Sequence, residues 1–413
     1  MRPLLHFTPP TGWMNDPNGL VHHGGRWHLF HQHNPAEPVW GDIHWGHASS
    51  ADLVHWSHHP PAISPHPQLG VAASGCCVQD HDGSLVALFT HLPVPEDSGP
   101  QIQSLARSRD GGRTWEHQHG VLENPGEPDF RDPKVFWHQP TQAWVMVLAV
   151  GQRISVYRSP DLLSWQHASD FGDGLGCHEG VWECPDLFEL GGRWVMLVSL
   201  TQGAPAGGSG TQVFTGSFDG FSFTAEPEWG WLDHGPDNYA TVSFANVSGR
   251  RVVLGWMSNW DHARETPTVG WRGQMTLPRE LSWRRGLHIE PAREITALRA
   301  GGEELGGELP AGACELELPP GPLQLRLHNE RESARLSVGQ ERIELDVSES
   351  LVPGPMKRRC WGPATAQPLR VVVDHGSIEV FAGRTCLSSL AFFERALDRV
   401  RLEGARARVW RLA

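Results

Sequence analysis

A hydrophobic segment recurs five times in the first part of the chain, and this repeat constrains the fold more than any other feature. The five copies begin at Arg26, Ser84, Ala143, Arg193 and Arg251, at nearly even spacing. Each copy is a Gly or polar start followed by an aromatic or β-branched run, which is typical of a buried β-strand. A repeat with a period of about 50–60 residues predicts a structure made of five similar units.

A second motif follows each of the first four segments. It reads Ser-x-Asp, then a short loop and an aromatic residue, and it begins at Ser50, Ser108, Ser159 and Ser217. Asp and Ser side chains in such positions cap the backbone of a turn. A unit of about four strands is one blade of a β-propeller, so five units predict five blades around a central channel. A β-sandwich with evenly spaced hairpins is the alternative.

The pattern changes after residue 290. Apolar and polar residues alternate from there on, as in Leu323-QLRLHNE and Arg342-IELDV. Strict alternation with frequent turns predicts an antiparallel β-sandwich. We therefore expect an all-β chain with a five-bladed β-propeller at residues 1–290, a linker at 291–298 and a C-terminal β-sandwich at 299–413. No site-like cluster of acids or histidines occurs in the last range, so we expect the sandwich to be ancillary.

Charge and cysteine content narrow the classes of partner. The formal net charge of −13 disfavours phosphate backbones and anionic lipid surfaces, so we expect neither nucleic acid nor membrane as a partner. Seven cysteines without a CxxC pair do not form a disulfide framework. The first residues show no apolar stretch typical of a signal peptide, which favours a cytoplasmic protein. A secreted mature form is the alternative.

Three acids, each in a motif with a proline, occupy matching places in the repeat: Asp16, Asp132 and Glu183. Each precedes the tryptophan of the next hydrophobic segment by nearly the same number of residues, these tryptophans being Trp27, Trp144 and Trp194. Equal offsets predict equivalent positions in blades one, three and four, where the innermost strands line the channel. We therefore expect the three carboxyl groups to converge.

Three acids with Arg131 nearby suit glycoside hydrolysis, which needs one carboxylate as nucleophile or base and one protonated acid. The His pairs lack zinc-ligand spacing, so we expect no metal. Tryptophans beside the motifs are candidates for stacking on sugar rings: Trp13, Trp40, Trp45, Trp182 and Trp271.

Several motifs, in order, resemble the signature blocks of glycoside hydrolase family 32, the β-fructosidases (invertases, levanases and exo-inulinases). They are Trp13-MNDPNG, Trp27-HLFHQHNP, Trp45-GHASS, Phe130-RDPK, Trp182-ECPDLF and Trp271-RGQMTLPREL. Asp374-HGSIEVF resembles the family's sandwich motif. Ordered motifs that cover essentially the whole chain are far more specific than a single pattern. The resemblance implies a five-bladed propeller joined to a β-sandwich.

The resemblance also implies roles for individual residues. Asp16 would be the nucleophile, Glu183 the acid/base, and Asp132 the transition-state stabiliser beside Arg131. The positions that match a fructose pocket are Asn15, Gln32, Trp40, Ser74 and Trp271. A covalent fructosyl-enzyme would retain configuration, and it predicts carboxyl groups of Asp16 and Glu183 about 5–5.5 Å apart. Neither a metal nor an organic cofactor is expected.

Two departures from the family pattern concern the walls of the pocket. His31 and His33 stand where family members usually carry Tyr, and Ala73 stands where a Phe is expected. Histidines can titrate near neutrality, so we expect His31 and His33 to influence the pH profile. Loss of the Phe ring changes the shape of one pocket wall.

The segment from Trp256 to Trp271 resembles levanases and exo-inulinases more than bacterial sucrose hydrolases. We expect release of terminal non-reducing β-D-fructofuranosyl units from sucrose, short fructo-oligosaccharides or fructans. A fructosyltransferase and a non-catalytic carbohydrate-binding propeller remain alternatives, and the oligomeric state stays open.

Overall fold

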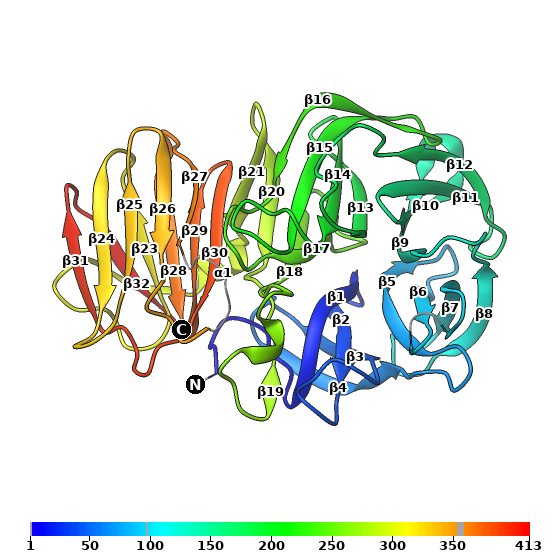
Figure 1. Ribbon diagram of the computed structural model, residues 1–413, viewed down its shortest axis with the longest axis horizontal. Helices are drawn as coiled ribbons and strands as arrows, with labels where there is room; N and C mark the ends of the chain where they lie inside the picture. The colour runs from blue at the N-terminus through cyan, green and yellow to red at the C-terminus, as the bar shows by residue number, and fades with distance from the viewer. Residues whose placement is uncertain (1, 96–97, 353–358) are drawn as a thin grey trace.

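The computed structural model describes residues 2–95, 98–352 and 359–413. Within these residues, five sheets form a ring and two further sheets form a sandwich beside it (Figure 1). The prediction of an all-β chain with a five-bladed propeller followed by a β-sandwich is confirmed. No helix in the described ranges is long and apolar enough to cross a bilayer.

Each blade is an antiparallel sheet, and its first strand lies nearest the centre of the ring. Blade one contains β1 (Gly12–His23), β2 (Arg26–Asn34), β3 (His44–Ser50) and β4 (Trp56–Ile63). Blade two contains β5 (Val71–Gln79), β6 (Leu85–Leu92), β7 (Ile102–Ser108) and β8 (Glu116–Leu122). Blade three contains β9 (Arg131–His138), β10 (Ala143–Val150), β11 (Arg153–Ser159) and β12 (Gln166–Phe171). Blade four contains β13 (Trp182–Leu190), β14 (Arg193–Leu200), β15 (Gly210–Phe218) and β16 (Phe223–Trp231). Blade five contains β17 (Tyr239–Ser243), β18 (Arg251–Trp256), β20 (Arg279–Trp283) and β21 (Leu287–Pro291).

The ring closes through direct contacts between the innermost strands of neighbouring blades. The innermost strands β1, β5, β9, β13 and β17 contact one another in sequence, and β17 contacts β1. The short strand β19 (Trp271–Arg272), which follows β18 in the chain, pairs in parallel with β1. The contacts of β17 and β19 with β1 therefore hold the two ends of the propeller segment together. Two 3₁₀ turns, η2 (Gln139–Thr141) and η3 (Ala263–Glu265), lie in connections between strands.

The repeated motifs take the structure that their sequence predicts. The five hydrophobic segments coincide with the second strands of the blades, β2, β6, β10, β14 and β18. At the end of the third strand of blade one, Asp52 Oδ1 accepts the backbone N–H groups of Val54 and His55. The equivalent aspartates of the next three blades do the same at their own turns: Asp110, Asp161 and Asp219.

The sandwich consists of two antiparallel sheets whose inward residues alternate with exposed ones. One sheet has the order β22 (Arg299–Glu304), β32 (Arg408–Leu412), β23 (Cys314–Leu318), β28 (Leu369–Asp374), β29 (Gly376–Ala382) and β30 (Thr385–Ala391). The other has the order β27 (Arg359–Pro363), β26 (Arg342–Asp346), β25 (Ser333–Val338), β24 (Leu323–His328) and β31 (Arg399–Glu403). The helix α1 (Arg293–Ala297) separates β21 from β22. The division into domains at residues 291–298 remains a prediction.

A buried ionic network joins the propeller to the sandwich. Arg279 on β20 donates to Asp233 (2.9 Å) and to Glu379 on β29 (2.7 Å). His6 lies between Glu379 and Asp374, and each of its ring nitrogens is 2.8 Å from a carboxylate oxygen. Burial by itself lowers the pKa of His6, but the hydrogen bonds to Asp374 and Glu379 outweigh it and raise the pKa to about 9. One network of buried ion pairs thus links the N-terminal segment and the fifth blade to the sandwich.

We expect Arg279→Met to lower the free energy of unfolding by about 3–5 kcal/mol, because it leaves buried Asp233 without its cation and Glu379 with only one of its two. Denaturant titration measures the change. Arg284→Met is the matched control, since Arg284 belongs to an exposed pair with Glu290, and such pairs contribute about 0–1 kcal/mol. Equal effects of the two substitutions would contradict the stabilising role of the network.

Candidate active site

A pocket of about 280 Å³ opens at the centre of the ring, on the side where the innermost strands begin. The three predicted acids line it together, although they lie on β1, β9 and β13. The other residues of its wall are Asn15, Gln32, Trp40, Ala73, Leu92, Arg131, Thr201, Gln202, Trp260 and Arg264. The structure therefore brings together Asp16, Asp132 and Glu183 from distant parts of the sequence.

A local irregularity in each innermost strand directs these side chains. The register shifts between Met14 and Pro17 in β1 and between Glu183 and Asp186 in β13, and the other three innermost strands shift at equivalent places. Asp132 and Cys184 have φ of 63° and 47°, in the left-handed region. A bulge re-aims a side chain and locally ends regular pairing.

The prolines of the three acidic motifs have a structural reason. Pro17, Pro133 and Pro185 follow Asp16, Asp132 and Cys184 directly, at the bulges. Proline has no N–H to donate, so within a sheet it is tolerated at bulges and edges. The Asp-Pro and Cys-Pro pairs thus mark the positions where a strand leaves regular pairing and turns a side chain into the channel.

The two carboxylate oxygens of Asp16 have different surroundings. Oδ2 accepts hydrogen bonds from Ser74 Oγ (2.7 Å) and Gln32 Nε2 (3.3 Å), and Cys184 Sγ lies 3.5 Å away. Oδ1 is buried and has no hydrogen-bond partner among the described residues. Burial raises the pKa of Asp16 to about 6, against the opposing hydrogen bond from Ser74. Hydrogen bonds hold Oδ2 in place, whereas Oδ1 has no such partner among the described residues.

Glu183 is held from two sides. Arg131 Nε donates to its Oε1 at 3.0 Å, and the hydroxyl of Tyr239 donates to its Oε2. Arg131 is itself fixed by an ion pair with Asp129. The carboxyl group of Glu183 is thereby fixed in one orientation by a cation and a phenol.

Asp132 lines the pocket together with these two acids. Its Oδ2 accepts the backbone N–H of Cys184 at 2.9 Å, and the thiol of Cys184 lies 3.6 Å from the same oxygen. Burial raises the pKa of Asp132, and the negative charge of Glu183 raises it further. Cys184 contacts both Asp16 and Asp132, so the backbone that carries Glu183 also positions the other two acids.

Tryptophan positions differ from the expectation. Trp40 lines the pocket, but Trp13, Trp45 and Trp182 are fully buried, so their faces cannot stack on a sugar. Trp271 is not among the residues that line this pocket, and its role in substrate binding stays a prediction. Its ring lies beneath the guanidinium of Arg2, 4.7 Å from the ring centroid, because pairing of β19 with β1 directs it to that side.

Ser74 also lies outside the pocket wall. It donates a hydrogen bond to Asp16 Oδ2, and its assignment to substrate binding stays a prediction. Asn15, Gln32 and Arg131 line the pocket as expected.

The departures from the family pattern can now be placed. His31 and His33 are buried, and burial lowers the pKa of both, so both stay neutral near pH 7. Burial thus disfavours their titration near neutrality, and their influence on the pH profile stays a prediction. Ala73 lines the pocket, so the small side chain leaves space where a Phe ring would stand.

Sequence reasoning missed Tyr239 and the rim of the pocket. Tyr239 begins the innermost strand of blade five, shortly before the hydrophobic segment at Arg251. The three acids precede the starts of their own segments by nearly the same offset, and so does Ser74 in blade two. Applied to Arg251, this offset points to Thr241 or Ala240 in the same strand, so it locates the strand but not Tyr239 itself. The rim residues lie at strand ends and in loops, which carry no repeat: Leu92, Thr201, Gln202, Trp260 and Arg264.

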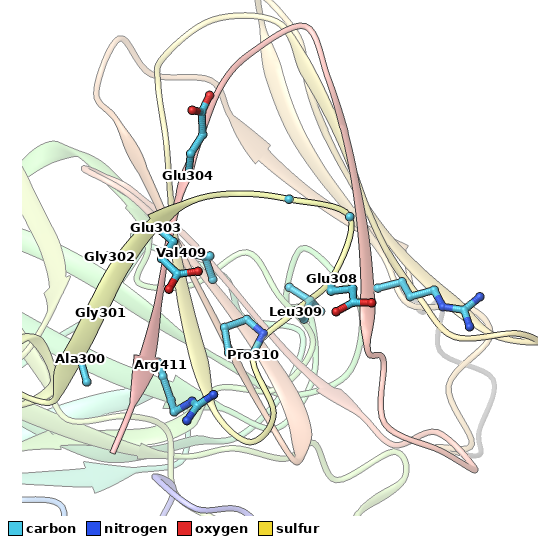
Figure 2. A pocket seen from close by; sticks show the side chains of 13 residues that line it. Ala300, Gly301, Gly302, Glu303, Glu304, Glu308, Leu309, Pro310, Val409 and Arg411 are labelled. Carbon is cyan, nitrogen blue, oxygen red and sulfur yellow. The ribbon is translucent and has the colours of Figure 1, made fainter.

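A larger, open groove of about 880 Å³ lies in the sandwich (Figure 2). Glu303, Glu304, Glu308 and Arg411 line it, where the chain arches away from β22 and β32. It contains none of the site residues predicted from the sequence. Its carboxylates are exposed, whereas those of the propeller pocket converge in a buried place. In the described part of the chain, no group of His, Cys, Asp or Glu is arranged to hold a metal ion.

Comparisons with known proteins agree on one family. The model of the glycosyl hydrolases family 32 N-terminal domain matches residues 6–291, and that of the C-terminal part matches residues 321–407. Levanase from Bacillus subtilis (strain 168) is 45% identical over 328 residues, which cover 72% of this chain and 48% of the levanase. An extracellular exo-inulinase from Aspergillus niger is 39% identical over 332 residues, which cover 68% of this chain and 62% of the relative.

The chain thus spans about half to three-fifths of the length of these curated relatives. Among solved structures, the exo-inulinase from Aspergillus awamori superposes with a TM-score of 0.89 at 30% identity. The superposition covers 100% of this chain and 98% of that one.

Proposed function

The chain belongs to glycosyl hydrolases family 32, and from this membership and the pocket we propose that it is a retaining β-fructosidase. It would release terminal non-reducing β-D-fructofuranosyl units from sucrose, short fructo-oligosaccharides or fructans. The observation that carries the proposal is the meeting of Asp16 and Glu183 in one pocket, with Oδ1 of Asp16 buried and unpartnered among the described residues. A retaining glycosidase needs a nucleophilic carboxylate and an acid/base placed this way.

The proposed first step is attack on the anomeric carbon of the terminal fructosyl unit. Oδ1 of Asp16 forms the new bond while Oδ2 stays hydrogen-bonded to Ser74 and Gln32. Glu183 gives its proton to the departing glycosidic oxygen. The N–H of Arg131 and the hydroxyl of Tyr239 then stabilise the carboxylate that remains.

In the second step Glu183 takes a proton from water, which attacks the fructosyl-enzyme and frees Asp16. Two displacements at the same carbon retain its configuration. Asp132 accepts hydrogen bonds from fructose hydroxyls beside the reacting carbon. The separation of about 5–5.5 Å between the carboxyl groups of Asp16 and Glu183 remains a prediction of this mechanism.

The size of the pocket supports action at a chain end. A volume of about 280 Å³ lies at the lower limit of small-molecule sites, which hold about 300–1,000 Å³. A pocket of this small volume favours a terminal unit as the reacting sugar. Sucrose and the non-reducing ends of fructans both present such a unit.

We expect kcat/KM for sucrose to fall on the acid side of about pH 6, because Asp16 must be ionised to attack and its pKa lies near that value. The hydrogen bond from Ser74 lowers the pKa of Asp16, so Ser74→Ala should move this acid limb to higher pH. The expected shift is about 0.5–1 pH unit. Ser49→Ala on β3, which contacts Arg26 and His59, is the control. An acid limb that Ser74→Ala leaves in place would contradict the assignment of Asp16.

The direct test of the proposed function is sugar release from sucrose, 1-kestose, inulin and levan, with chromatographic identification of products. Free fructose from at least one of them supports the proposal, and no activity on any β-fructoside refutes it. Longer oligosaccharides at high sucrose concentration would instead indicate a fructosyltransferase. Binding of a β-fructoside without turnover would indicate a non-catalytic carbohydrate-binding protein.

The cellular location stays a prediction. The exo-inulinase from Aspergillus niger is named extracellular, and this relative supports the secreted alternative over the cytoplasmic expectation. Fractionation of the producing cells decides between them.

A further inference from the structure

One side of the pocket rim adjoins Glu183, and it is formed by the chain after β14. Glu183 pairs with Ser199 in the sheet ladder, and Thr201 exchanges hydrogen bonds with Val181, the residue before β13. Thr201 and Gln202 therefore line the pocket directly beyond the proposed proton donor. Because Glu183 protonates the glycosidic oxygen, the leaving group must lie on this side.

The segment that contains Arg264 lies against the same side. Gln202 Nε2 donates to Asp261 Oδ1 at 3.4 Å, which places the chain around η3 next to Gln202. Arg264 belongs to η3 and lines the pocket. Its neighbour Trp260 also lines the pocket and packs on Trp13 in a stacked arrangement.

Arg272 fixes this segment relative to the loop that carries Trp40. Its guanidinium donates to the backbone carbonyls of Pro38 (3.1 Å) and Arg264. Trp40 and Arg264 thus project from two loops that a single side chain ties together. The rim is a built surface with two indole rings and one cation.

The guanidinium of Arg264 is exposed, and it has no hydrogen-bond or ion-pair partner among the described residues. By contrast, Arg131 in the same pocket is paired with two carboxylates. An arginine presents five N–H donors in a planar fork, which fits two neighbouring hydroxyl oxygens of a sugar. A small alkyl leaving group offers no such acceptors.

We propose that Arg264 determines leaving-group specificity by donating hydrogen bonds to the hydroxyl groups of the sugar that departs. This inference rests on the proposed function and deepens it: the preferred substrates carry a neutral, hydroxyl-rich sugar on the far side of the cleaved bond. Trp40 and Trp260 flank that sugar, and Arg264 fixes its orientation.

Two substrates with the same fructosyl unit test the proposal: sucrose, which releases glucose, and methyl β-D-fructofuranoside, which releases methanol. We expect Arg264→Ala to lower kcat/KM for sucrose by about 10- to 100-fold and to leave kcat/KM for the methyl fructoside unchanged. The loss should appear mainly in KM, since the contact exists before and during bond cleavage. Arg264→Lys should recover only part of it, because an ammonium group lacks the planar fork.

Product inhibition gives a second readout. The inhibition constant of D-glucose should rise in Arg264→Ala, while that of D-fructose, which binds at the acids, should stay the same. Arg406→Ala is the control, since Arg406 is an 89% exposed arginine of the sandwich. Equal losses on both substrates, or no loss on either, would overturn the role of Arg264.

Failure of the proposed function gives a different result. In that case the wild-type protein hydrolyses neither sucrose nor the methyl fructoside, before any variant is compared. A wild type that is active on both substrates, combined with an Arg264→Ala variant that does not discriminate between them, refutes only the inference about the leaving group.

Discussion

Asp16→Asn should abolish turnover of sucrose, with a loss of about 10⁴-fold or more, while the protein remains folded. An amide cannot form the fructosyl ester that a carboxylate forms, although it has nearly the same size and shape. The neighbours Ser74 and Gln32 can still contact the side-chain oxygen of asparagine. The variant therefore removes the chemistry and keeps the packing.

The same substitution should stabilise the protein at neutral pH. Burial raises the pKa of Asp16 from 3.8 to about 6, so above pH 6 the folded state carries a charge that it holds less favourably than the unfolded state. This shift corresponds to about 3 kcal/mol, which Asp16→Asn recovers above pH 6 and no longer recovers below pH 4. Denaturant titrations at pH 4 and pH 7.5 measure the difference between variant and wild type.

Asp173→Asn is the matched control for both measurements, because Asp173 is an exposed carboxylate outside the pocket wall. It should change neither turnover nor the pH dependence of stability. Undiminished turnover in Asp16→Asn would refute the assignment of Asp16 as the nucleophile. A gain in stability that is independent of pH would contradict the argument from burial.

Glu183→Gln should lower kcat for sucrose by about 10²- to 10⁴-fold, the usual contribution of a general acid. Glutamine keeps an acceptor for Arg131 but has no proton to give to the departing oxygen. An aryl β-fructofuranoside with a nitrophenolate leaving group does not need that proton. We therefore expect Glu183→Gln to lower the rate of the first step much less on the aryl substrate than on sucrose.

The release of the aryl group should then be followed by slow hydrolysis of the fructosyl-enzyme, since Glu183 also activates the water. A burst of nitrophenolate in a stopped-flow trace reports this accumulation. Glu179→Gln, an exposed neighbour in sequence, is the control and should behave as wild type. Equal losses on sucrose and on the aryl substrate would show that Glu183 does not act as the proton donor.

Residues that follow the repeat could be predicted well. The offset from each hydrophobic segment placed Asp16, Asp132 and Glu183 at equivalent points of three blades, and the structure brings the three together. The offset works because every innermost strand has a bulge at nearly the same place. Asp16 and Asp132 lie within the bulges of their strands, and Glu183 lies at the start of its bulge. Tyr239 lies at the start of the matching bulge in β17, although its offset from Arg251 is longer.

Residues near a motif but outside the repeat could not be placed in this way. Trp271 is the first residue of a family motif, yet its strand pairs with β1 and its ring lies beneath the guanidinium of Arg2. Successive residues of a strand point to opposite faces, so neighbourhood in the sequence does not decide which face a side chain takes. The residue type of His31 by itself indicates titration near neutrality, whereas its burial lowers its pKa, and the sequence does not show that burial.

The number of blades, the caps of their turns and the three acids could be read from the chain before any coordinates, because each depends on spacing and on the chemistry of one short segment. Three other features emerged only from the folded molecule: which tryptophans face the pocket, which oxygen of Asp16 is free, and that Gln202, Trp260 and Arg264 meet at its rim. These features depend on contacts between segments that are distant in the chain. Such contacts follow from ring closure and bulge geometry, and no local pattern of residues encodes them.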